Sequence, residues 1–235
     1  MVVRKLQVMT RILAAVMAVL LLMFGPSGPA LADQSAQLKQ AMAATRKADF
    51  ETALRVAGQR GSVSHDIVVW HWLRAGLGSA GDVEVFLDRR PDWPGLGWLR
   101  RKSEPSFTNE APSRILKFYD QSPPQTAEGV LARASALLDS GHAGDAQAEL
   151  VLAWRTMPMG SVIQDDYLKH HAKLLASHHA ARLDRLLWDG HKVSARRMLP
   201  LVSTDQRKLA EARLALQEVE PGVDGKIAAV PDALK

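Results

Sequence analysis

Residues 181–199 read Ala-Arg-Leu-Asp-Arg-Leu-Leu-Trp-Asp-Gly-His-Lys-Val-Ser-Ala-Arg-Arg-Met-Leu. Within this stretch Leu183, Leu186 and Leu187 stand at i, i+3 and i+4, which is the spacing of one face of an α-helix. The Asp-Gly pair at 189–190 ends this helix, and a second helical pattern follows it. The stretch therefore predicts a helical hairpin. Its first helix is expected to carry these residues on the polar side: Arg182, Asp184, Arg185 and Asp189.

The same hairpin pattern recurs along the chain. Counted from Gly190, a small residue stands at +5 and a larger apolar residue at +9, and the same offsets follow Gly141. Looser copies start at Gly78 and Ala48. The copies are 30, 63 and 49 residues apart, whereas a regular tetratricopeptide (TPR) array repeats near 34. We therefore expect an all-α fold over 33–235, an irregular α-superhelix that is a TPR-like solenoid of helical hairpins. The +5 and +9 residues are Ala53 and Ala57, Val83 and Leu87, Ala146 and Leu150, and Ala195 and Leu199.

Composition limits the chemistry that is open to the chain. Its 235 residues are 47% hydrophobic and 23% charged, and none is cysteine. Disulfide scaffolds, thiolate nucleophiles and cysteine-ligated metals are therefore excluded. The net charge of +5 first suggests a nucleic-acid partner. However, residues 33–235 carry 27 basic and 25 acidic residues, a net charge of only +2, so we expect no nucleic-acid partner.

The N-terminus has the pattern of a secretory signal peptide. Basic residues at Arg4, Lys5 and Arg11 precede an unbroken apolar run over 12–24, and Ala-Leu-Ala at 30–32 ends the segment. The apolar run is shorter than the roughly 20 residues that span a bilayer. We therefore expect residues 1–32 to be a signal peptide cleaved before Asp33, a product exported to the periplasm, and no stable membrane anchor.

Two segments depart from regular hairpins. Prolines between Pro105 and Pro124 enclose a single short helical piece near 115–119, which predicts a connection between two groups of hairpins. The segment 220–235 has no further hairpin to cover its apolar residues. Because a solenoid without a capping unit exposes its last apolar face, we expect 220–235 to fray and the array to be truncated.

Particular stretches carry a family likeness. The first are His71-Trp-Leu-Arg-Ala-Gly76, Pro91-Asp-Trp-Pro-Gly95 and Leu99-Arg-Arg-Lys-Ser-Glu104. Next come Pro124-Gln-Thr-Ala-Glu-Gly129 and Ala153-Trp-Arg155, and the clearest are 181–188, 195–202 and 209–216. Together they resemble the N-terminal superhelical domain of soluble lytic murein transglycosylases, from about residue 64 to the end of the chain.

The resemblance implies a U-shaped helical array in the periplasm, within enzymes that cleave the glycan strands of peptidoglycan. In that family a separate C-terminal lysozyme-like domain holds the catalytic glutamate in a Glu-Ser motif. None of the nine glutamates of this chain precedes a serine, so we expect that domain to be absent. The chain by itself is therefore expected to be inactive, with peptidoglycan glycan strands and other cell-wall proteins as partners.

Titratable clusters give little sign of a metal or catalytic site. The pairs His170-His171 and His178-His179 lack the i, i+3 or i, i+4 spacing of a chelate, and Ser177 has the character of an N-cap. The adjacent carboxylates at 165–166 point about 100° apart on a helix and cannot flank one glycosidic bond. We expect a polar helix junction and first-turn acids, with no catalytic residue, metal or cofactor.

Basic clusters beside tryptophans form the candidate binding site. Indole rings stack on sugars and guanidinium groups pair with carboxylates, so such clusters could line a groove for glycan strands with acidic stem peptides. The alternative is that the tryptophans fill hairpin cores and the arginines are solvated. We favour this alternative for Trp154 and Trp188, and it stays open for the tryptophans of the groove. The candidate groove comprises Arg89, Arg90, Trp93, Trp98, Arg100 and Arg101.

A function of a different class also stays open, a stand-alone periplasmic TPR-like module that holds a protein partner on its concave surface. The DNA downstream of the codon for Lys235 separates the two hypotheses. The first requires it to encode the rest of the superhelix and a Glu-Ser-containing domain.

Overall fold

The computed structural model describes residues 28–234, with side chains from Asp33 onward, and in this range the secondary structure is helical, without strands. The expected all-α fold is confirmed. The apolar run 12–24 of the expected signal peptide lies outside the described residues, and the expected cleavage position falls inside helix α2 (Gly28–Arg46). Of the helices described, none is both long enough and apolar enough to cross a membrane.

The chain divides into two compact units between Trp72 and Leu73. Unit 1 contains α2, α3 (Phe50–Val56) and most of α4 (Val63–Arg74). Helices α2 and α3 pack on each other, and Ala41, Ala53 and Ala57 are completely buried in the cluster that they share with Val68. Small side chains at this contact let the two backbones approach closely. The single helical domain expected over 33–235 stays a prediction.

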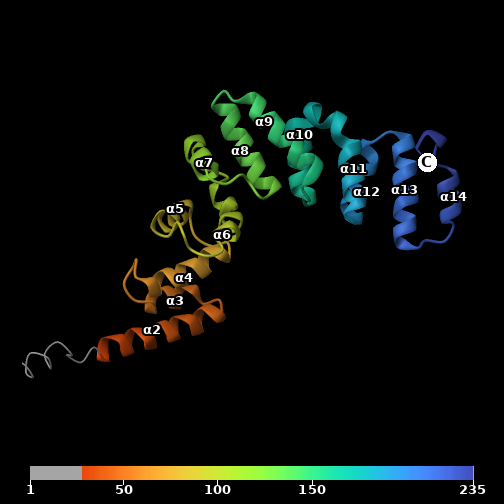
Figure 1. Cartoon of the computed structure of the whole chain (residues 1–235). Helices are drawn as coiled ribbons and strands as arrows, with labels where there is room; N and C mark the ends of the chain where they lie inside the picture. The colour runs from red at the N-terminus through yellow and green to blue at the C-terminus, as the bar shows by residue number, and fades with distance from the viewer. Residues whose placement is uncertain (1–27, 235) are drawn as a thin grey trace, which may run out of the picture. The chain divides into compact units, whose positions relative to one another are not determined.

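Unit 2 holds the remaining helices, which follow one another in chain order from yellow to blue in Figure 1. Neighbours along the chain form many of the contacts: α7 with α8, α8 with α9, α11 with α12, and α13 with α14. The α-helices are α5 (Ala80–Arg89), α6 (Leu96–Ser103), α7 (Pro112–Tyr119), α8 (Ala127–Asp139), α9 (Ala143–Thr156), α10 (Ser161–Leu175), α11 (His179–Trp188), α12 (Lys192–Met198), α13 (Thr204–Glu218) and α14 (Val223–Ala228). The 3₁₀ helices are η1 (Glu104–Phe107), η2 (Ala176–His178), η3 (Leu199–Leu201) and η4 (Asp232–Leu234).

The turns between hairpin helices use left-handed backbone. Gly78, Gly141 and Gly190 have φ of +93°, +81° and +75°, and Ala48 has φ of +58°. Glycine suits this conformation because it has no Cβ. The residues five positions later are completely buried, as the predicted repeat requires: Ala53, Val83, Ala146 and Ala195. The hairpins predicted to start at Ala48, Gly141 and Gly190 are confirmed, because α2 packs on α3, α8 on α9 and α11 on α12. The copy at Gly78 and the continuation of the hairpins as a superhelix stay predictions.

The main core of unit 2 gathers side chains from α8 to α13. Trp154 is fully buried, as expected, and stacks on Tyr167 with ring centroids 5.9 Å apart. The Tyr167 hydroxyl donates a hydrogen bond of 3.0 Å to the carbonyl oxygen of Ala127, which ties α10 to α8. The leucines at 183, 186 and 187 are buried, so the apolar face of α11 lies where the sequence placed it.

Two expectations about α11 are wrong. Arg182, expected on the polar side, is only 1% exposed, whereas Trp188, expected in the core, is 80% exposed. Helix phase explains both. Arg182 stands four residues before Leu186 and shares its buried face, and Trp188 stands four residues after Asp184 and shares its exposed face.

Helix α10 also differs from expectation. Its N-cap is Gly160, so Asp165 and Asp166 lie in the second turn and not in the first. The backbone leaves helical geometry at His171, with φ of −131° and ψ of 20°. The chain then continues through η2, so Ser177 lies inside a helical turn, and the N-cap of α11 is His178. An N-cap residue typically has extended backbone, which the continuous helical path denies to Ser177.

The two irregular segments contain more helix than expected. The connection 105–124 includes most of η1 besides α7, and α7 begins at Pro112, before the predicted 115–119. In the segment after residue 220, α14 packs on α13 and Val230 is buried. Fraying of 220–235 in solution stays a prediction, which hydrogen exchange of its amides can test.

Candidate binding site on helices α5 to α7

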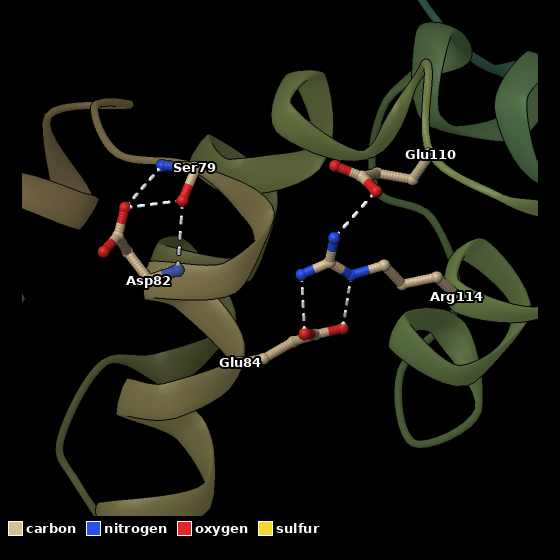
Figure 2. A network of polar contacts seen from close by, with 5 residues as sticks. All are labelled: Ser79, Asp82, Glu84, Glu110 and Arg114. Carbon is tan, nitrogen blue, oxygen red and sulfur yellow. Dashed lines mark hydrogen bonds and ion pairs between the residues drawn. The ribbon is translucent and has the colours of Figure 1, made fainter.

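Helix α5 begins with a capping box. Ser79 accepts a hydrogen bond of 3.3 Å from the backbone N–H of Asp82, and the Asp82 carboxylate accepts one of 2.9 Å from the backbone N–H of Ser79 (Figure 2). These bonds satisfy two donors that the start of a helix leaves free. Val83 and Phe86 are buried on the inner face of α5, whereas Arg89 at its C-terminal end is exposed and the C-cap Arg90 is half-buried.

An arginine holds α5 and α7 together. Arg114 binds the Glu84 carboxylate at two points, from Nε at 3.1 Å and from Nη2 at 2.8 Å (Figure 2). Its Nη1 donates to Glu110 at 2.8 Å. The hydrogen bonds from Arg114 hold the pKa of Glu84 below its usual value. This two-point contact fixes the distance between the two helices.

A hollow of about 460 Å³ lies beside this contact, between α5, α6 and α7. Its wall combines apolar groups with charges of both signs. The lining residues are Glu84, Leu87, Asp88, Pro91, Leu96, Arg100, Lys117, Phe118, Asp120 and Gln121. Of the six residues predicted for the glycan groove, Arg100 alone is among these lining residues.

Arg100 is engaged within the fold. Its Nη1 donates a hydrogen bond of 3.0 Å to the carbonyl oxygen of Phe118, and its guanidinium lies 5.5 Å from the centroid of the Phe118 ring. Its Nη2 donates to Gln121 at 3.4 Å. Partial burial lowers the pKa of the Arg100 guanidinium, which stays charged at neutral pH. Arg100 therefore connects α6 to the end of α7. A substitution of Arg100 would remove these contacts within the fold, so it would change the stability of the protein as well as any contact with a ligand.

Trp98 and the cations around it lie on the outer side of α6. Trp98 is 47% exposed, whereas its neighbour Leu99 is completely buried. Arg101 and Lys102 follow at i+3 and i+4, and their cationic groups lie 5.9 Å and 5.1 Å from the ring centroid. This spacing places the indole ring near two positive charges, all on one exposed helix surface.

Trp93 forms a second, less exposed cluster. Its ring meets the Phe86 ring edge-on at 6.0 Å, and the Arg90 guanidinium lies 5.1 Å from its centroid. Trp93 is half-buried, so the Phe86 contact anchors it to the core of α5. The structure thus divides the predicted groove into two tryptophan–cation clusters, with Arg100 directed inward and Arg89 exposed at the end of α5.

A buried carboxylate adjoins this region. Glu104, which is buried, accepts hydrogen bonds from the backbone N–H of Gln125 at 2.6 Å and from the N–H and hydroxyl of Thr126 at 3.0 Å and 2.5 Å. Burial raises its pKa, while these hydrogen bonds act in the opposite direction. Three donors thus occupy this carboxylate, which holds the loop that starts α8 in place.

A buried arginine has a structural role that the sequence did not reveal. Arg182 Nη1 donates to the carbonyl oxygens of Trp154 and Met157 at 2.5 Å and 3.1 Å, and the guanidinium lies 4.5 Å from the Trp154 ring centroid. These carbonyls belong to the C-terminal end of α9, where a cation is favoured. Burial lowers the pKa of Arg182 to about 10, so it is a cation at neutral pH.

A second hollow, of about 780 Å³, lies between α9 and α11. The sequence does not predict this hollow, because the expected position of Trp188 is in the core. The signal that could have revealed it is the spacing of the lining residues, most of which stand at i, i+3, i+4 and i+7 within each helix. The lining residues are Ala148, Val151, Leu152, Arg155 and Thr156 from α9, and Ala181, Asp184, Arg185 and Trp188 from α11.

The histidine pairs are divided between structural environments. Burial lowers the pKa of His171, which lies at the kink in α10, and of His179, whose ring is 5.5 Å from that of Trp154. In the part of the chain that the structure describes, no group of three or more His, Asp or Glu side chains is placed to hold a metal ion.

Comparison with known proteins gives no match to a family model, to a curated protein or to a solved structure.

Proposed function

We propose that this chain is an exported helical module that binds peptidoglycan and does not cleave it. In this proposal residues 1–32 direct export to the periplasm, and the hairpins form an irregular, TPR-like superhelix. The ligand class follows from the resemblance of its residues to the N-terminal part of soluble lytic murein transglycosylases.

The observation that carries the proposal is the surface around Trp98. An exposed indole ring presents an apolar face on which a pyranose ring can stack. Arg101 and Lys102, both within 6 Å of the ring centroid, supply positive charge for the carboxylates of stem peptides. A ligand that combines sugar rings with acidic peptides matches both parts of this surface.

The proposal is tested by co-sedimentation of the purified protein with insoluble peptidoglycan. Trp98→Ala should weaken binding by about tenfold, which corresponds to about 1.4 kcal/mol. The double variant Arg101→Gln/Lys102→Gln should weaken binding most at low salt, because exposed charges are screened as salt rises.

Two variants serve as matched controls. Trp188→Ala removes another exposed tryptophan, and Lys208→Gln removes an exposed cation on α13. Neither should change the pelleted fraction. Equal pelleting of Trp98→Ala and the parent protein would contradict the proposed surface. Release of 1,6-anhydro products from murein by the purified chain would contradict binding without cleavage.

A further inference from the structure

The groove between α9 and α11 exposes an unusual amount of apolar side chain. Trp188 is 80% exposed and Leu152 is 63% exposed, and they line the same hollow with Val151 and Ala181, which are half-buried. Large apolar groups gathered at a hollow on the surface mark an interaction site more often than isolated ones do. Tryptophan is also among the residues that contribute most to binding at protein interfaces.

The two walls of the groove have helical periodicity. Ala148, Val151, Leu152 and Arg155 stand at i, i+3, i+4 and i+7 on α9. On α11 the same series is formed by the residues 181, 184, 185 and 188. Each series is about 10 Å long, two turns of helix. Rows at this spacing accept the ridges of a third helix.

The walls also exclude a ligand that adds a strand. Backbone N–H and C=O groups in the middle of α9 and α11 are paired within their own helices. An extended peptide would find no free backbone edge there, whereas a helix brings its own backbone pairs with it. The rows of side chains on the two walls therefore match a helical occupant better than an added strand.

The charged side chains of the groove favour an occupant of one sign of charge. Arg185 pairs with Asp189 at 2.7 Å, and Asp184 pairs with Arg213 at 2.5 Å, so these charges are balanced locally. Arg155 is exposed and has no hydrogen bond or ion pair among residues 33–234. One uncompensated positive charge thus borders the apolar floor, and a carboxylate on the occupant complements it.

We propose that the α9–α11 groove binds an amphipathic helix of a partner protein, with apolar residues at i and i+3 or i+4 and an acidic residue facing Arg155. Leu152 and Trp188 contact the apolar stripe of this helix. The inference goes beyond peptidoglycan binding and uses none of the residues around Trp98.

The test uses two labelled, amidated 18-residue helical peptides with the same leucine stripe. One carries three glutamates on the flank of the stripe and the other carries three lysines. Fluorescence anisotropy with the purified protein should show at least tenfold tighter binding of the Glu peptide. Trp188→Ala should weaken its binding at least tenfold, and Arg155→Glu should reverse the preference between the two peptides. Lys208→Glu, a charge reversal outside the groove, should leave the preference unchanged.

Each of the opposite results overturns the proposal. These are equal affinity for the two peptides, absence of binding by the Glu peptide at 1 mM, or affinity that neither Trp188→Ala nor Arg155→Glu changes. Sedimentation of the protein alone gives another such result if it forms a dimer that Trp188→Ala abolishes, because the occupant is then a second copy. Because peptidoglycan pelleting depends on Trp98 in the proposed function, either proposal can fail while the other holds.

Discussion

Replacing Gly141 with alanine should destabilise the folded protein by about 1–2 kcal/mol, the usual energy of holding an L-residue with a Cβ in left-handed backbone. Gly141 has φ of +81°, and a Cβ built on it would meet no other group within 4 Å. Steric overlap therefore contributes nothing, and the whole expected loss comes from the backbone conformation that starts the α8–α9 hairpin.

Thermal and urea unfolding measure this loss. In a protein of about 200 residues, 1 kcal/mol corresponds to a change in Tm of about 2–4 °C, so Gly141→Ala should lower Tm by about 2–8 °C. Gly144→Ala is the matched control, because Gly144 lies in the first turn of α9 and also has open space at its Cβ. Alanine favours the helix, so this variant should be about 0.5–1 kcal/mol more stable than the parent.

The same reasoning gives the reverse sign at Ala48. This residue already has φ of +58°, so Ala48→Gly relieves strain in the turn between α2 and α3. The gain should be about as large as the loss at Gly141, since the greater conformational entropy of glycine in the unfolded chain reduces both effects equally. If Gly141→Ala and Gly144→Ala shift Tm equally and in one direction, the left-handed turn is not what decides the stability of the hairpin.

Three further perturbations test other parts of unit 2. Gly129→Ala should lower the free energy of unfolding by about 1–3 kcal/mol in urea titrations, because its Cβ would lie 2.3 Å from Glu104 Oε2; an unchanged midpoint would refute this overpacking. Arg114→Lys should lower the free energy of unfolding slightly, because lysine cannot form the two-point contact with a carboxylate; a neutral effect in the same titration would show that the pair adds no stability. Lowering the pH from 7.5 to 5 should reduce the Tm of the parent more than that of His171→Gln/His179→Gln. Burial lowers both folded-state pKa values, so the unfolded chain binds protons first as the pH falls below 6.5, and equal slopes would contradict this.

The hairpin turns were predictable from the sequence because their signal is local. A glycine followed by a small residue at +5 and an apolar residue at +9 describes a turn and its helix contact within ten positions. The structure gives Gly141 and Gly190 left-handed backbone and buries Ala146 and Ala195 completely. Even the looser copy starting at Ala48 has the left-handed turn, although alanine is costly there.

The environment of α11 could not be predicted, because its decisive partners are distant in sequence. A buried guanidinium needs acceptors, and Arg182 finds them in carbonyl groups 25 and 28 residues earlier. Residue type alone places tryptophan inside and arginine outside, which is the reverse of what occurs at Trp188 and Arg182. The inward position of Arg100, a residue of the predicted glycan groove, could not be predicted for the same reason. Its hydrogen-bond acceptor is the carbonyl group of Phe118, 18 residues later.

The position of the α9–α11 groove on its helices separates binding from folding. On α9 the buried Leu150 precedes the groove residue Leu152 by two positions, about 200° around the helix, so the two lie on nearly opposite faces. On α11 the same offset separates the buried Leu186 from Trp188. The hairpin core therefore does not require apolar side chains at 152 and 188, and polar residues there would change stability by only about 0.5 kcal/mol. Since folding does not explain these residues, the proposed partner helix gives their apolar character a physical reason.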